Sequence, residues 1–101
     1  AEAREEDTPV PSASAFAMID EVTSGSPAAD DGLLVGDLVV QFGEVRHSGG
    51  GELARVAQAL QQNVGSAMQV VVQRQGLPCT LSVTPRPWAG RGYLGCHMRP
   101  L

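Results

Sequence analysis

Apolar residues occur in short runs along the chain, separated by groups rich in glycine, proline and small polar residues. They begin at alternate positions with Phe16 and Met18 and continue to Val22, a pattern that predicts a first strand. The segment 38–42, LVVQF, is a continuous apolar run with β-branched residues and is followed by Gly43, which predicts a buried strand. The first part of the fold is therefore expected to contain two strands.

Two segments have the signals of helices. Ser26 is suited to cap a helix, Pro27 to occupy its first turn and Gly32 to end it, so a short helix is predicted between the two strands. Residues 52–64 carry apolar side chains at three- and four-residue spacing, with Gly65 where a helix should stop. This second segment predicts the one full helix.

Strand signals return after the full helix. The runs 68–74 and 77–84 flank Gln75-Gly76, which predicts a hairpin. Residues 88–98 form a glycine-punctuated stretch that is expected to be a loop feeding a final short strand. This order of elements predicts a small, mostly antiparallel α+β domain over residues 16–101.

Charge is distributed unevenly along the 101 residues, whose net charge is -4. Residues 1–15 combine acids, prolines and small residues with no hydrophobic period, which predicts an acidic flexible linker. Beyond Glu52 there are no acids, and the chain carries Arg55, Arg74, Arg86, Arg91 and Arg99. Widely spaced arginines without any lysine are too sparse for a nucleic-acid interface, so a small anion is the expected partner of this half.

Several other chemistries receive no support from the sequence. Cys79 and Cys96 match no metal-ligand spacing and are too few for a disulfide scaffold, so we expect reduced, half-buried thiols in a cytoplasmic or nuclear protein without a metal or cofactor. The apolar runs are too short to cross a membrane, and residues 1–10 do not resemble a signal peptide.

Catalysis is not indicated either. No serine stands in a G-x-S-x-G context. Asp20-Glu21 and Asp30-Asp31 are pairs of neighbours, whose side chains are expected to diverge into solvent and not to form a catalytic pair. No catalytic residue is therefore predicted, and the protein is not expected to be an enzyme.

Residues 90–95, GRGYLG, fit the string G-x-G-x-x-G. A dinucleotide site would need a following helix and an acid, whereas only six residues follow Gly95 in this sequence. Closely spaced glycines also allow successive backbone N–H groups to turn inward and form an anion-binding concavity. Such a concavity is the interpretation that we favour, and a flexible tail is the alternative.

Residues 26–43, SPAADDGLLVGDLVVQFG, resemble the segment around the first strand pair of PDZ domains, and the full helix followed by two strands falls where these domains have theirs. The usual carboxylate-binding loop comes first in that family, whereas the only candidate here, YLGC at 93–96, comes last. The resemblance thus implies a circularly permuted PDZ domain, a small antiparallel β-sandwich or partial barrel. It also implies that the domain binds the free carboxyl ends of other proteins by strand addition.

Residues 86–97, RPWAGRGYLGCH, are similar to the C-terminal stretch of the chaperones that assemble the base of the proteasome regulatory particle. That similarity implies a preceding helical domain and, as the partner, the hydrophobic C-terminal tail of a proteasomal ATPase subunit. Tyr93 and Cys96 depart from the common PDZ loop. Permuted PDZ domains also regulate proteases, so a substrate-sensing domain of a protease remains the alternative.

Strand addition assigns roles to particular residues. The carboxylate-binding loop is predicted to comprise Arg91, Gly92, Tyr93, Leu94 and Gly95, with the amides of the last three facing the carboxylate and Arg86 as an auxiliary charge. The peptide-pairing strand is predicted to comprise Cys96, His97 and Met98, with Leu94, Cys96 and Met98 lining one face. The groove helix is predicted to offer Ala54, Ala57, Gln58 and Gln61, unless these four are an ordinary exposed face.

One preference of the groove follows from a missing residue. PDZ domains that prefer Ser or Thr two residues before the peptide terminus resemble one another in having a histidine at the start of this helix, whereas here the helix starts ELA at 52–54. A hydroxyl would find no partner there, so an apolar residue is expected at that position.

Overall fold

The computed structural model describes residues 15–101. The predicted linker, residues 1–15, therefore lies outside the described residues except for Ala15, which is buried. The described elements are β1 (Ala17–Val22), α1 (Pro27–Asp30), β2 (Leu38–Phe42), β3 (Val45–Arg46), α2 (Glu52–Gln62), β4 (Met68–Arg74), β5 (Leu77–Val83) and β6 (Cys96–Pro100). The predicted α+β domain with one short and one full helix is confirmed, and the two-residue strand β3 is the one element that the sequence pattern did not indicate.

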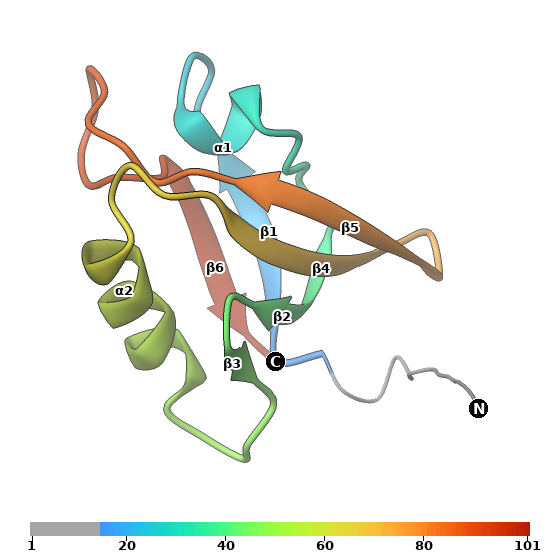
Figure 1. Cartoon of the computed structure of the whole chain (residues 1–101). Coiled ribbons are helices and arrows are strands. Elements are labelled where there is room, and N and C mark those ends of the chain that lie inside the picture. The colour runs from blue at the N-terminus through green and yellow to red at the C-terminus, as the bar shows by residue number, and fades with distance from the viewer. Residues whose placement is uncertain (1–14) are drawn as a thin grey trace.

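The six strands form one antiparallel sheet in the order β5-β4-β2-β1-β6, with β3 paired to β2 beside this path. Figure 1 shows the β4–β5 hairpin crossing the β1–β6 pair, so that the sheet curves around the core. The last strand of the chain thus pairs with the first, which is the arrangement that a permuted PDZ domain requires. The outer edge of β6 has no strand partner among residues 15–101.

The core lies inside the curve of the sheet and is closed by α2. Its largest fully buried apolar side chains are Phe42, Ile19, Leu33, Val39, Val70, Val72 and Val83. From α2, Val56 is buried against them. No helix among the described residues is long and apolar enough to cross a membrane.

A β-bulge interrupts the pairing of β1 with β6. Ile19 lies opposite Met98 and Glu21 opposite His97, so Asp20 is the extra residue on β1. Because the bulge shifts the alternation of side chains, Ile19 is fully buried and Val22 packs partly against the core, three residues apart. The expected strand is confirmed, but Met18 is only half-buried between the fully buried Ala17 and Ile19, so the expected alternation through Met18 is wrong even before the bulge.

An ion pair holds the turn before β2. The Asp37 carboxylate is buried and accepts hydrogen bonds from the Leu34 amide at 3.0 Å and from Arg74 Nε at 2.9 Å and Nη2 at 2.7 Å. Arg74 Nη2 also donates to the Gly32 carbonyl at 2.8 Å. Together these bonds tie the segment after α1 to the end of β4.

Candidate functional site

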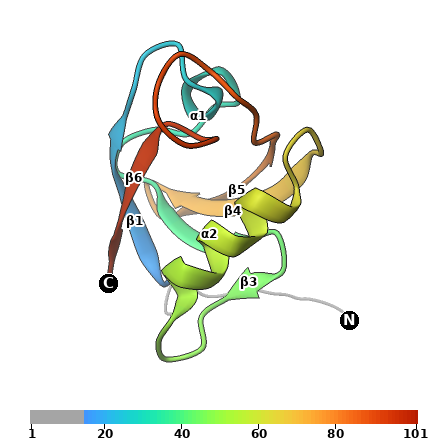
Figure 2. The ribbon, with the colours of Figure 1, turned by 90° about the vertical axis from the view of Figure 1, so that its left-hand side faces the viewer.

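A cavity of about 510 Å³ lies where the loop before β6 approaches the C-terminal half of α2. Figure 2 shows this loop above β6, with α2 in front of the sheet. The residues that line the cavity are Glu21, Thr23, Leu60, Trp88, Gly90, Arg91, Gly92, Tyr93, Leu94, Gly95, Cys96 and His97. All five residues predicted for the carboxylate-binding loop are therefore brought together at one cavity.

Three carbonyl groups hold the loop in place. The Tyr93 carbonyl accepts from the Arg86 amide at 2.9 Å, that of Leu94 from the Ala28 amide at 2.8 Å, and that of Gly95 from the Thr23 amide at 2.9 Å. By contrast, no hydrogen bond within residues 15–101 has the N–H of Tyr93, Leu94 or Gly95 as its donor. These three consecutive amides are therefore free to donate to a group outside the described residues, and an anion is one group that such an arrangement can accept.

Gly95 is required by the geometry of this loop. Its φ of +83° lies in the left-handed region, and a Cβ at this position would collide with the Cβ of Ser26 and approach Trp88 Cζ2 to 2.8 Å. Ser26 is itself fixed because its Oγ accepts from the Ala29 amide at 3.1 Å as the cap of α1. The Trp88 indole Nε1 donates to the Arg91 carbonyl at 3.1 Å and closes the loop on the other side.

The apolar side of β6 faces the cavity and the core. Leu94 is 4% exposed, and Cys96 and Met98 pack partly buried against the core, whereas His97 between them is exposed. Burial, with a smaller contribution from Asp20, raises the pKa of the Cys96 thiol to about 12. The thiol is therefore neutral at pH 7, and Cys96 is one of the residues that line the cavity.

The opposite wall comes from the side of α2 that carries Leu60, which also packs against the core. Leu60, which the helical spacing assigns to the core, lines the cavity beside β6. At the N-terminal end of α2 a second cavity of about 520 Å³ is lined by Leu53 and Ala54 together with Leu101 and His47. Ala57 and Gln61 are exposed on the helix between these two ends.

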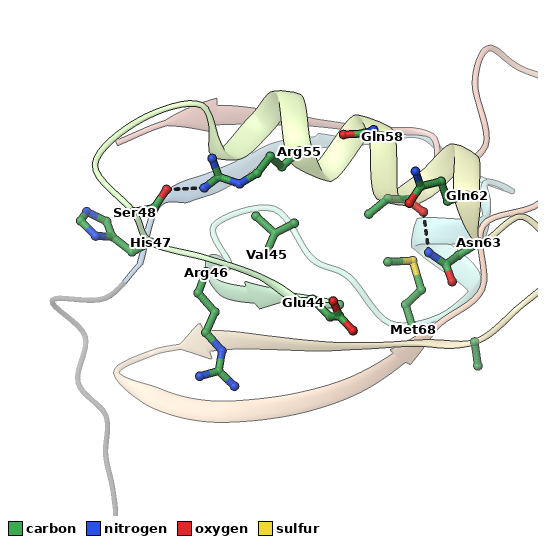
Figure 3. Close-up of a pocket in the computed structure, with 13 residues that line it drawn as sticks. Glu44, Val45, Arg46, His47, Ser48, Arg55, Gln58, Gln62, Asn63 and Met68 are labelled. Carbon is green, nitrogen blue, oxygen red and sulfur yellow. Dashed lines mark hydrogen bonds between the residues drawn. The ribbon is translucent and has the colours of Figure 1, made fainter.

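Gln58 does not belong to this side of α2. It lines a separate cavity of about 810 Å³ between α2 and β3, together with Arg55, Gln62 and Val45 (Figure 3). Helical geometry explains the difference, because Gln58 is two residues before Leu60 and so points about 200° around the helix from it. The assignment of Gln58 to the groove is therefore corrected.

Arg86 is committed to an ion pair. Its Nη1 donates to Asp31 Oδ2 at 2.9 Å and to the Thr84 carbonyl at 2.7 Å, and Nη2 lies 3.6 Å from Asp30 Oδ2. Burial alone would raise the pKa of the Asp31 carboxyl, but the hydrogen bonds from Arg86 and from the Thr84 amide hold that pKa below its ordinary value. Arg86 thus holds its segment through the bonds to Asp31 and Thr84. Asp31 is paired with Arg86 and is not the solvated acid that was expected.

Several residues of the site were not predicted from the sequence. Leu60 carries the same helical signal as a core residue, and Trp88 gave no signal beyond the resemblance. His47 precedes α2 in the sequence, yet it lines the cavity at the start of the helix. His47 is brought to the start of α2 by the turn through Gly49, Gly50 and Gly51, and no local pattern in the sequence indicates this contact.

The chemistry that this arrangement offers is recognition, through amide donors beside an unpaired strand edge and an apolar pocket. Within residues 15–101, no group of three or more His, Cys, Asp or Glu side chains is placed to hold a metal ion. Cys79 and Cys96 are both half-buried and free.

Comparison with known proteins places this geometry in a family. The family model described as "PDZ domain" matches residues 18–74. The chain is 40% identical over 87 residues to the rat protein named 26S proteasome non-ATPase regulatory subunit 9, covering 86% of this chain and 39% of the relative. The human protein of that name is 38% identical over 87 residues, with the same coverage.

A more distant relative is the budding yeast protein named probable 26S proteasome regulatory subunit p27. It is 33% identical over 87 residues, which cover 85% of this chain and 40% of the relative. The chain thus spans about two-fifths of the length of the curated relatives it matches. On the strength of the family model, the relatives and the fold, the chain belongs to the PDZ domain family.

Proposed function

We propose that this domain captures the free C-terminal end of a partner polypeptide by adding it as a strand to β6. The observation that carries the proposal is the row of amides at Tyr93, Leu94 and Gly95, which have no acceptor within residues 15–101 and stand at the start of a strand edge that is unpaired among those residues. An added strand would exchange main-chain hydrogen bonds with β6. Its terminal carboxylate would accept from the three amides, and its last side chain would enter the pocket beside Leu60 and Cys96.

The partner that we propose is the hydrophobic C-terminal tail of a proteasomal ATPase subunit, bound during assembly of the base of the regulatory particle. Three observations support this choice. The relatives are named as non-ATPase regulatory subunits of the 26S proteasome, and the loop segment 86–97 resembles that of assembly chaperones. The apolar character of the pocket, with Leu60, Leu94 and Cys96, suits an apolar terminal residue.

The test is a titration of C-terminal peptides from the proteasomal ATPase subunits, each as the free acid and as the amide. Amidation removes the negative charge that the three N–H donors would meet, and a hydrogen bond to a charged group contributes about 1.5–3 kcal/mol. We therefore expect the amide to bind at least about tenfold more weakly. An amide that binds within about twofold of the free acid would overturn the proposal.

A matched pair of variants on α2 locates the groove. Leu60→Ala should weaken binding of the free-acid peptide because Leu60 lines the pocket beside β6, whereas Gln62→Ala should not because Gln62 lines the cavity on the other side of the helix. Equal effects of the two variants would argue against this groove. In the groove between β6 and α2, a peptide with Val two residues before its terminus is expected to bind more tightly than a peptide with Thr there. The variant His47→Ala tests whether the His47 imidazole accepts a hydrogen bond from the Thr hydroxyl of the peptide.

A further inference from the structure

Three titratable side chains lie near one another on the exposed side of β6, and two of them, Glu21 and His97, also border the cavity described above. His97 Nδ1 lies 2.5 Å from Asp20 Oδ1, and Glu21 occupies the position directly across from His97 on β1. The side chains of His97 and Asp20 are 65% and 30% exposed, and Glu21 is exposed. This group therefore lies beside the free strand edge and within reach of solvent.

The bulge in β1 is what gathers the two carboxylates. In a regular strand, consecutive side chains point to opposite faces, so only one of Asp20 and Glu21 could lie on the side of His97. The bulge opposes both residues to His97, and the Asp20 side chain reaches the imidazole ring. Bulges re-aim side chains in this way, and the bulge here leaves the Asp20 carboxylate hydrogen-bonded to His97.

The register of an added strand brings one peptide position to this group, and this step rests on the function proposed above. If the terminal side chain enters the pocket on the same face as Cys96, the penultimate residue lies opposite His97 with its side chain on the exposed face. We infer that Asp20 and Glu21 select a lysine or arginine at the penultimate position of the bound peptide. A long cationic side chain can pass over the imidazole to Glu21, which is two strand spacings or about 10 Å away.

The next outward position on β6 carries the opposite charge. Arg99 is exposed and follows His97 by two residues, with its Nη2 3.9 Å from the sulfur of Met18 on β1. The peptide residue opposite Arg99 is the fourth from the end. A cation at that place faces a cation, so the same substitution should help at the penultimate position and hinder two residues upstream. Arg91 lines the loop end of the pocket, where the terminal carboxylate binds.

The size of the effect is limited by solvent. Exposed ion pairs contribute about 0.2–1 kcal/mol, which corresponds to a preference of at most about fivefold for Lys over Gln at the penultimate position. Salt screens such pairs, so this preference should shrink as the ionic strength is raised. The selection is therefore modest, and its dependence on position is its clearest signature.

The experiment uses one free-acid peptide with an apolar terminal residue, made with Gln or Lys at the penultimate position and, separately, at the fourth position from the end. Each is titrated against the unmodified chain and the double variant Asp20→Asn/Glu21→Gln in the same buffer. We expect Lys to bind about three- to fivefold more tightly than Gln at the penultimate position in the unmodified chain only. At the fourth position Lys should bind more weakly than Gln in both proteins.

The controls separate this inference from the proposed function. Because Glu21 also lines the cavity, the ratio of Lys to Gln binding is compared within each protein, and binding of the Gln peptide by the variant shows that its groove still accepts a peptide. Glu21→Gln alone serves if the double variant unfolds. Equal binding of the Lys and Gln peptides would overturn the inference and leave strand addition standing. A Lys preference that survives in the variants would also overturn it, and failure of every free-acid peptide to bind would overturn both.

Discussion

Replacement of Gly95 by alanine tests whether this loop is shaped by close packing or only by backbone conformation. Gly95 has a φ of +83°, and a non-glycine residue in the left-handed region costs about 1–2 kcal/mol. An added Cβ would also collide with the Cβ of Ser26 and lie 2.8 Å from Trp88 Cζ2, and overpacking of this kind costs about 1–3 kcal/mol more. The expected loss of unfolding free energy for Gly95→Ala is therefore about 2–5 kcal/mol.

Gly92→Ala is the matched control, because Gly92 has a φ of +68° in the same loop but no atom within 4 Å of an added Cβ. It should lose only the conformational part, about 1–2 kcal/mol. Urea unfolding followed by circular dichroism gives both values, and an unchanged slope with denaturant shows that the two states compared are the same. Equal destabilisation by the two variants would refute the steric part of the reasoning.

Three further predictions concern the ion pairs of Asp37 and Asp31 and the role of Cys96 in the pocket. Asp37→Ala should lower the unfolding free energy by about 1.5–3 kcal/mol in urea titrations, because it removes the charged acceptor of the Arg74 guanidinium and of the Leu34 amide, and a loss below about 1 kcal/mol would contradict this. The pKa of the Asp31 carboxyl is lowered in the folded state from 3.8, so its contribution to stability is complete above that pH and is lost as the pH falls below it. The variant Asp31→Asn should accordingly lose less stability between neutral pH and pH about 3 than the unmodified chain, and equal losses would show that the bond to Arg86 is not what responds. Finally, Cys96→Phe should shift the preference of the pocket towards smaller terminal residues, and an unchanged ranking across a peptide panel would remove Cys96 from the wall.

The local structure of this domain could be read from its sequence because its signals act within a few residues. Ser26 caps α1 as expected, with its Oγ accepting from the Ala29 amide. The hairpin turn at Gln75-Gly76 has positive φ at both residues, as a two-residue turn of this kind requires. The closely spaced glycines of the loop predict backbone donors that turn inward, and the N–H groups of Tyr93, Leu94 and Gly95 donate no hydrogen bond within residues 15–101.

Other features depend on how distant elements pack, and no local pattern encodes them. Helical spacing fixes which residues share a face of α2 but not which neighbour each face meets, so Leu60 and Gln58 could not be assigned to β6 or β3 in advance. The bulge at Asp20 exists only in the pairing of β1 with β6. Arg86 was expected to contact the peptide carboxylate, because nothing local in the sequence pairs it with Asp31, which lies 55 residues away. Only the folded chain brings the two side chains together.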